Sequence, residues 1–417
     1  MFPRWVQERV RKQLSVFPAV FLQGARQVGK TTLARQLIAE RVLQHYFTMD
    51  DPVVLASASQ DPKGFVENLP LHTVLDEVQR VPELLPVLKI RIDTEQRPGM
   101  FLLTGSANPL TLSQVAESLV GRMAIVTLDP LSQGEIERRP EQWIRQMFSG
   151  GSPSPPSQQT DDLDARILRG GFPRVAELPD REARQEWFRA YLTTLLSRDL
   201  RDLANVERLV ELPRLLNLLA TLSARLLNVA NLSRESGIPQ TTLQRYLAHL
   251  ETLFLITRVP AWYANLGKRL LKTPKLLLND SGLCAFLMNA DETRLQHDPL
   301  LRGQLYETFV GLELLRQIHH SVPEVHLYHY RTDKQEVDFV LENEQGQLVA
   351  VEVKASQTLG EADFRGLRGL HEAVGEHLVV GVVLYQGSQS LPFGERLWAQ
   401  PISALWDGTP NEPTETL

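Results

Sequence analysis

The sequence predicts an α/β protein of 417 residues with more than one domain, and three observations support this. Short apolar runs alternate with amphipathic stretches over residues 1–135, which is typical of a parallel sheet with helices. Leucine and alanine recur at three- and four-residue spacing from about residue 162 to 253, which indicates helices. After residue 298 the pattern predicts a helix, a strand, a hairpin, a second helix and an apolar strand, and hence a further α/β domain.

Composition excludes several classes of protein. With 43% hydrophobic and 23% charged residues, the chain is neither disordered nor collagen-like, and its net charge of −6 does not suit a protein that coats polyanions. One cysteine, Cys284, cannot form an internal disulfide, and zinc-site motifs are missing from the sequence. The longest apolar run is too short to cross a bilayer, and the start lacks the apolar stretch of a signal peptide. We therefore expect a cytoplasmic protein without membrane contact.

Five strands are expected in the N-terminal part, each followed by turn or helix signals. They are predicted at residues 19–23, 45–49, 73–75, 100–104 and 124–128. A glycine-rich loop follows the first of them and precedes a helical stretch at 33–41. Its Walker A pattern, G-x-x-x-x-G-K-[ST], lets backbone N–H groups surround phosphates at a helix N-terminus.

This loop predicts a binding site for ATP. Lys30 would neutralise the β and γ phosphates, and the hydroxyl of Thr31 would ligate Mg²⁺. The residues expected to bind the nucleotide are Gly24, Ala25, Arg26, Gln27, Val28, Gly29, Lys30, Thr31 and Thr32.

Further candidates follow the third, fourth and fifth strands. Carboxyl ends of parallel strands present ligands, so Asp76 is expected to hold the Mg²⁺ and Glu77 to orient or deprotonate the attacking water. Ser106 is a candidate for sensing the γ phosphate, with a tight polar turn as the alternative. Arg122 is a candidate arginine finger, acting within its chain or across a subunit interface, with a surface arginine as the alternative.

Residues 232–250 have the form of a helix–turn–helix. Gly237 can adopt the positive φ of the turn, and the leucines of the second helix would face inward. The two strands expected next complete a winged helix, and residues 207–280 contain ten Lys and Arg against five Asp and Glu. That excess favours contact with nucleic-acid phosphates, although a protein-contact module is the alternative. The side chains expected to contact DNA are Gln240, Thr241, Gln244, Arg245, Lys268, Arg269, Lys272 and Lys275.

A nuclease-like pattern occupies the C-terminal hairpin. Glu352 and Lys354 point to the same face of a strand, and the hairpin can bring Asp338 against them. Asp338 and Glu352 would be metal ligands, Lys354 would steer or activate the water, and Glu307 could supply a further carboxylate. Residues from 301 onward carry 8 basic and 17 acidic side chains, so a retained fold without cleavage is an open alternative.

Motifs over nearly the whole chain together resemble one family. They are residues 21–32, 75–79, 103–106, 118–122, 170–173, 279–283, 336–339 and 351–354. The combination resembles the prokaryotic AAA-type ATPases that carry a C-terminal domain of unknown function. The resemblance implies an AAA-type P-loop ATPase sheet, a helical lid and winged helix, and a C-terminal restriction-endonuclease-like α/β domain of the PD-(D/E)xK kind. It also implies ATP hydrolysis with Mg²⁺ and a homo-oligomer, for which a hexameric ring is one arrangement.

Four segments and one leading function are therefore expected. The segments are an ATPase domain at 1–135, a helical lid region at 136–215 with a flexible Ser/Pro-rich loop at 149–161, a winged-helix domain at 216–297 and a restriction-endonuclease-like domain at 298–417. The leading hypothesis is an ATP-hydrolysing motor that binds and remodels or processes DNA, for example branched DNA. A nucleotide-controlled signalling or defence switch and an ATP-regulated, metal-dependent DNA nuclease remain alternatives.

Overall fold

The computed structural model describes residues 1–106, 121–150, 162–196, 211–265, 267, 269 and 272–407. It divides into two units, each described here by itself. The first is Met1–Leu131 with Leu250–Phe254, and the second is Ser132–His249 with Leu255–Leu417. Most of the Ser/Pro-rich loop predicted at 149–161 lies outside the described residues.

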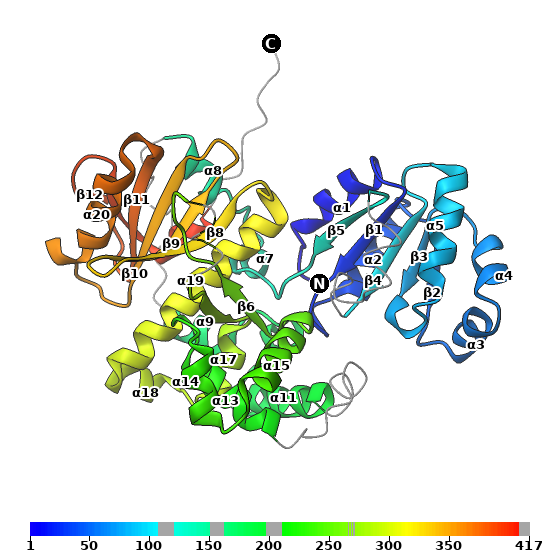
Figure 1. Ribbon diagram of the computed structural model, residues 1–417, viewed down its shortest axis with the longest axis horizontal. Coiled ribbons are helices and arrows are strands. Elements are labelled where there is room, and N and C mark those ends of the chain that lie inside the picture. Colours follow the sequence, from blue (N-terminus) through cyan, green and yellow to red (C-terminus); the bar gives the residue numbers. More distant parts are fainter. Residues whose placement is uncertain are drawn as a thin grey trace, which may run out of the picture. The chain divides into compact units, whose positions relative to one another are not determined.

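The first unit contains a five-stranded parallel sheet in the order β2-β3-β4-β1-β5, drawn in blue and cyan in Figure 1. All five strands predicted from the sequence are confirmed, with ends that differ by one residue at most. The strands are β1 (Ala19–Gln23), β2 (His45–Thr48), β3 (Thr73–Asp76), β4 (Phe101–Gly105) and β5 (Met123–Thr127).

Helices cover this sheet because its strands are apolar on both faces. Phe21, Leu75 and Phe101 point to one face and share a buried core with α3, α4 and α5. Val20 and Leu22 point the other way and are also fully buried, while α1 contacts β1 and β5 and α2 contacts β2 and β4. The helices are α1 (Val6–Leu14), α2 (Lys30–Ala39), α3 (Pro52–Gln60), α4 (Pro62–Glu67) and α5 (Leu84–Glu95).

The second unit begins with a helical segment and a small hairpin. Gly237 ends α14 with φ 75°, which confirms the predicted turn before α15. Strands β6 and β7 pair antiparallel, and Leu226 forms a further antiparallel bridge with Lys275. The elements are α7 (Gln133–Glu137), α8 (Trp143–Phe148), α9 (Leu163–Arg169), α10 (Pro173–Ala176), α11 (Arg181–Thr194), α13 (Leu212–Thr221), α14 (Val229–Ser236), α15 (Gln240–Thr252), β6 (Ile256–Val259), β7 (Lys275–Leu278), α17 (Ser281–Leu287) and α18 (Glu292–His297).

A six-stranded mixed sheet follows in the second unit, in the order β12-β13-β11-β10-β9-β8. The predicted hairpin is confirmed as the antiparallel pair β9 and β10, and β11 lies parallel to β10. Leu367 and Leu370 of α20 are buried against Val340 and Val383 of the sheet. The elements are α19 (Pro299–Ser321), β8 (His326–Arg331), β9 (Glu336–Glu342), β10 (Leu348–Lys354), α20 (Arg365–Val374), β11 (Leu378–Tyr385), β12 (Leu391–Pro392) and β13 (Leu397–Pro401).

The length and composition of the helices decide whether one of them could span a membrane. Within the part of the chain that the structure describes, none of them combines the length and apolar character needed to span a bilayer.

Candidate functional site

The loop between β1 and α2 has the backbone geometry of a phosphate-binding loop. Gly24 has φ 152°, and a Cβ there would lie 2.2 Å from the carbonyl oxygen of Leu128. Gly29 has φ 102° and caps the N-terminus of α2. Both positions therefore require glycine, and the loop leads directly into a helix N-terminus, where N–H groups and the helix dipole favour an anion.

The side chain of Lys30 is buried against this loop and bonded to it. Its Nζ donates to the carbonyl oxygens of Gly24 at 2.9 Å and Ala25 at 2.8 Å, and the residue is only 5% exposed. The ammonium charge is therefore fixed at the loop before any phosphate binds. Because these two contacts already hold the Lys30 side chain in place, phosphate binding costs little of the conformational entropy of that side chain.

Asp76 is the centre of a hydrogen-bonded cluster at the carboxyl end of β3. Its Oδ2 accepts from Thr31 Oγ1 at 2.9 Å and from the Tyr46 hydroxyl at 2.5 Å, and its Oδ1 accepts from the Thr104 hydroxyl. The structure thus brings together Thr31 and Asp76, the two residues predicted to hold Mg²⁺. Burial and the Asp76 carboxylate raise the pKa of Tyr46 to about 12, so this hydroxyl stays protonated at neutral pH.

Glu77 follows Asp76 in a left-handed backbone conformation with φ 59°. Its N–H donates to Thr104 Oγ1 at 3.2 Å. The amide of Gln79 donates both to the Glu77 carboxylate and, at 3.1 Å, to the hydroxyl of Ser106. Gln79 therefore links the predicted water-orienting carboxylate to the predicted phosphate sensor.

Three residues of this site escaped prediction from the sequence: Arg4, Tyr46 and Gln79. Arg4 donates to the carbonyl oxygens of Val28 at 2.5 Å and Asp129 at 2.6 Å, so a second cation braces the phosphate loop. Tyr46 reaches the site because β2 lies beside β3. The position of Gln79, two residues after an Asp-Glu pair, was the one local signal available.

Arg122 lies at the amino end of the parallel strands, whereas the phosphate loop lies at their carboxyl end. It directly precedes β5, whose start pairs with the start of β1, and the loop follows the end of β1. Strand β1 separates the two ends by roughly 16 Å, at about 3.3 Å per residue. The guanidinium of Arg122 forms an ion pair with Asp93, and the side chain is partly exposed.

The predicted nuclease-like residues of the second unit also lie together. Lys354 Nζ donates to Glu352 Oε1 at 2.9 Å, and Asp338 Oδ2 accepts from the N–H of Val353 at 2.9 Å. Burial and the neighbouring Asp338 carboxylate raise the pKa of both Glu307 and Glu352 above its ordinary value. These groups form a dense, largely buried acidic cluster.

The residues predicted to contact DNA divide into two groups. Gln240, Thr241, Gln244 and Arg245 are exposed on α15, opposite its buried leucines, as expected. Lys272 is also exposed, and its ammonium lies 5.4 Å from the centre of the Tyr263 ring.

Two of the predicted DNA contacts are wrong, and Lys268 lies outside the described residues. Arg269 forms a two-bond ion pair with Glu342, at 2.5 and 2.9 Å, and its side chain is only 10% exposed. Lys275 is 1% exposed, and its ammonium pairs with Glu307 and Asp338. Both side chains are held by carboxylates of the second unit, with Lys275 buried and Arg269 only partly exposed.

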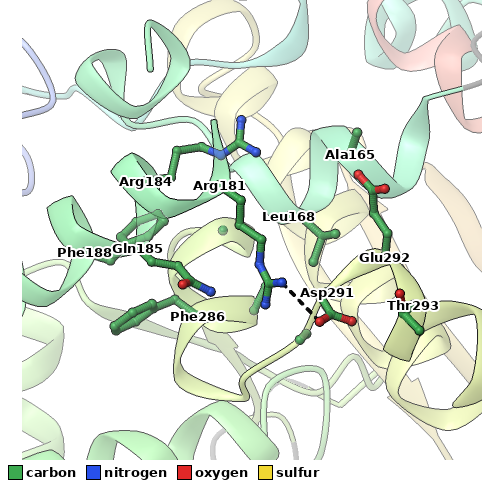
Figure 2. A pocket seen from close by; sticks show the side chains of 13 residues that line it. Ala165, Leu168, Arg181, Arg184, Gln185, Phe188, Phe286, Asp291, Glu292 and Thr293 are labelled. Atoms are coloured by element: carbon green, nitrogen blue, oxygen red, sulfur yellow. Dashed lines mark ion pairs between the residues drawn. The ribbon is translucent and has the colours of Figure 1, made fainter. Parts of the chain in front are cut away.

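A cavity of about 310 Å³ opens between α9, α11, α17 and α18 (Figure 2). Arg181 and Arg184 line it from α11, and Arg181 Nη1 lies 3.1 Å from Asp291 Oδ2. Phe188 adds an apolar wall. The sequence predicted no site here, and acidic side chains oppose the arginines, so the lining selects no class of ligand.

Comparison with known proteins places this chain in a family. It is 31% identical over 399 residues to the uncharacterized protein Rv2008c of Mycobacterium tuberculosis and, equally, to Mb2031c of Mycobacterium bovis. These matches cover 95% of this chain and 83% of each relative. The chain belongs to the family of these two mycobacterial proteins.

Three family models match successive parts of the chain. Residues 16–137 match an AAA domain, residues 160–294 match a domain of unknown function (DUF8612) and residues 302–405 match another (DUF4143). The expected AAA-type module and the expected C-terminal domain of unknown function are confirmed at this level.

Among solved structures, the chain is similar to the Walker-type ATPase PABY2304 of Pyrococcus abyssi. The identity is 18%, the TM-score is 0.38, and the match covers 69% of this chain and 96% of the other.

Proposed function

We propose that this protein is an ATP-hydrolysing AAA-type motor that binds and remodels DNA, such as branched DNA or junctions. The observation that carries the proposal is the cluster at the carboxyl ends of the strands. There Lys30, Thr31, Asp76 and Glu77 lie around one phosphate-binding loop. Hydrolysis of a nucleoside triphosphate requires that the phosphates are bound, that a metal ion is held and that a water molecule is positioned. These residues can perform all three tasks.

Each residue has a distinct task in the proposed reaction. The loop N–H groups and Lys30 bind the phosphates, and Ser106 contacts the γ phosphate. The Thr31 hydroxyl and the Asp76 carboxylate lie 2.9 Å apart and offer the hard oxygen ligands that Mg²⁺ prefers. A Mg²⁺ ion held by these two residues would stabilise the negative charge of the phosphate oxygens. Glu77, steadied by Gln79, orients the attacking water.

The middle of the chain supports the DNA part of the proposal. The order α13, a bridge at Leu226, α14, α15, β6 and β7 is the order expected of a winged helix, and it supports this part of the proposal. Its second helix presents Gln240, Thr241, Gln244 and Arg245 to solvent, as a recognition helix would. Lys272 is an exposed cation of the intervening loop. We infer that this surface contacts the phosphate backbone and bases of DNA.

The test is the rate of ATP hydrolysis with and without single-stranded, duplex and four-way-junction DNA. A motor is expected to show steady turnover that DNA stimulates, most strongly for the structure that it remodels. Tight retention of nucleotide with little turnover, unchanged by any of the three DNAs, would instead indicate a nucleotide-controlled switch and contradict the proposal.

DNA affinity is expected to depend on Arg245 and Lys272. Replacing both by alanine should weaken binding to all sequences and reduce the slope of log affinity against log salt by about two, roughly one per lost phosphate contact. Fluorescence anisotropy over a range of salt concentrations measures this slope. Replacing the exposed Lys334 and Arg365 is the matched control and should leave the slope unchanged. Equal slopes for the parent and the first variant would move the contact elsewhere.

We propose that Arg122 contacts the nucleotide bound to a neighbouring subunit of a homo-oligomer. It lies at the amino end of the strands, away from the phosphate loop of its own chain. Mixing Arg122→Ala chains with Lys30→Ala chains should partly restore hydrolysis, since each chain supplies what its neighbour lacks. Turnover is measured over several mixing ratios, with each variant alone as the control. If turnover fails to recover at every ratio, Arg122 does not complete the site of a neighbour.

A further inference from the structure

The acidic cluster of the second unit already contains a cation. The Lys275 side chain extends from β7 into the cluster, where its ammonium forms an ion pair with Glu307. The same Nζ lies 3.2 Å from the carbonyl oxygen of Asp338 and 3.5 Å from its Oδ1. At 1% exposure, this ammonium is removed from solvent, and its charge is balanced by the carboxylates around it.

A divalent metal does not fit the cluster with Lys275 in place. A metal ion needs several oxygen atoms directed at one point. Here Glu307 Oε1 and Asp338 Oδ1 face Lys275, Asp338 Oδ2 accepts from the Val353 N–H, and Glu352 Oε1 accepts from Lys354. The remaining oxygen, Glu352 Oε2, is buried without a hydrogen-bond donor, but a single free oxygen is fewer than a divalent metal needs. Among the described residues, including all three carboxylates, no group of three His, Cys, Asp or Glu side chains is arranged to hold a metal.

The backbone of Lys275 is paired on both sides, which fixes where its side chain begins. It pairs with Val259 in the β6–β7 hairpin and forms a bridge with Leu226 on its other side. The ammonium also lies 5.1 Å from the centre of the Phe339 ring, a contact that favours a cation. The lysine is therefore held by strands on both sides of its backbone and by carboxylates and a ring at its tip.

We propose that the ammonium of Lys275 takes the place of the divalent cation in this nuclease-like site. The fixed internal cation fastens β7 to α19 and β9, and it prevents Mg²⁺ or Mn²⁺ from binding between Glu307 and Asp338. The C-terminal domain then serves as a folded scaffold that does not bind a catalytic metal. This inference does not depend on the proposed ATPase or DNA functions.

The test is Mn²⁺ binding to the full-length chain without nucleotide, measured by calorimetry. The parent and Asp338→Asn should bind Mn²⁺ alike, because neither has a metal site in the cluster. Lys275→Met should gain one Mn²⁺ site that the parent lacks, and adding Asp338→Asn should remove it. Lys334→Met, which removes an exposed lysine of the same unit, should gain nothing. A folded Lys275→Met chain without the new site overturns the proposal.

A second measurement covers the case in which Lys275→Met does not fold. Mn²⁺ is added to the parent and to Asp338→Asn, and both melting temperatures are followed. With Lys275 as the cation, Mn²⁺ shifts both proteins equally. If Mn²⁺ raises the melting temperature of the parent alone, a metal binds at Asp338 and the proposal is wrong.

Discussion

Replacing Lys30 by alanine is expected to weaken ATP binding about ten- to hundredfold and to abolish measurable turnover. Hydrogen bonds to charged groups contribute about 1.5–3 kcal/mol each, and about 1.4 kcal/mol corresponds to a factor of ten. Lys30 is the buried cation directly beneath the phosphate loop, and its two contacts are to main-chain oxygens of the loop. Without it, the β and γ phosphates lose their nearest protein charge. Titration with a fluorescent ATP analogue and a phosphate-release assay measure the two effects.

Two controls separate this loss from a loss of folding. Lys63→Ala removes an exposed lysine of the same unit, whose ion pair with Glu67 is open to solvent, and should change neither binding nor turnover. A cooperative melting transition of Lys30→Ala without nucleotide should show that the variant is folded, although the carbonyl oxygens of Gly24 and Ala25 lose a donor. Unchanged ATP affinity in a folded Lys30→Ala chain would contradict the proposed site.

The parts of the nucleotide site that follow from local sequence could be predicted. Strand ends and the glycine spacing depend on neighbouring residues, so β1, β3 and the loop between β1 and α2 were found without knowing the sheet order. Tyr46 and Arg4 could not be found in this way. Tyr46 meets Asp76 because two strands 30 residues apart are neighbours in the sheet, and Arg4 reaches Asp129 across 125 residues.

The two predicted DNA contacts that are wrong show why a count of basic residues does not by itself identify a DNA-binding surface. Arg269 and Lys275 belong to a stretch rich in basic residues, and such a stretch indicates a phosphate-binding surface only if its cations reach solvent. Their carboxylate partners lie 73 and 32 residues further along the chain, in Glu342 and Glu307. Pairing over these separations is decided by tertiary structure, and no local pattern reports it. Among the described cations that were predicted to contact DNA, Arg245 and Lys272 are the exposed ones, and the DNA proposal therefore uses these two.

Replacing Glu77 by glutamine is expected to leave ATP bound and to slow its hydrolysis at least about a hundredfold. A positioned general base contributes about 10²–10⁴ to a rate, and glutamine keeps the size of the side chain but loses its negative charge. The Glu77 main chain would be unchanged, because the left-handed conformation and the N–H contact to Thr104 are the same for both residues. Single-turnover hydrolysis measures the rate, and equilibrium binding checks that ATP affinity stays within about twofold of the parent.

The position of Gln79 makes this prediction more specific. Its amide holds the Glu77 carboxylate on one side and Ser106 on the other, so Gln79→Ala should slow hydrolysis less than Glu77→Gln while also leaving ATP bound. Glu83→Gln neutralises an exposed carboxylate of the same segment and should leave the rate unchanged. Turnover equal to that of the parent in Glu77→Gln would remove this carboxylate from the reaction. If instead both Glu77→Gln and Glu83→Gln slowed hydrolysis equally, the effect would come from the general loss of negative charge rather than from a positioned base.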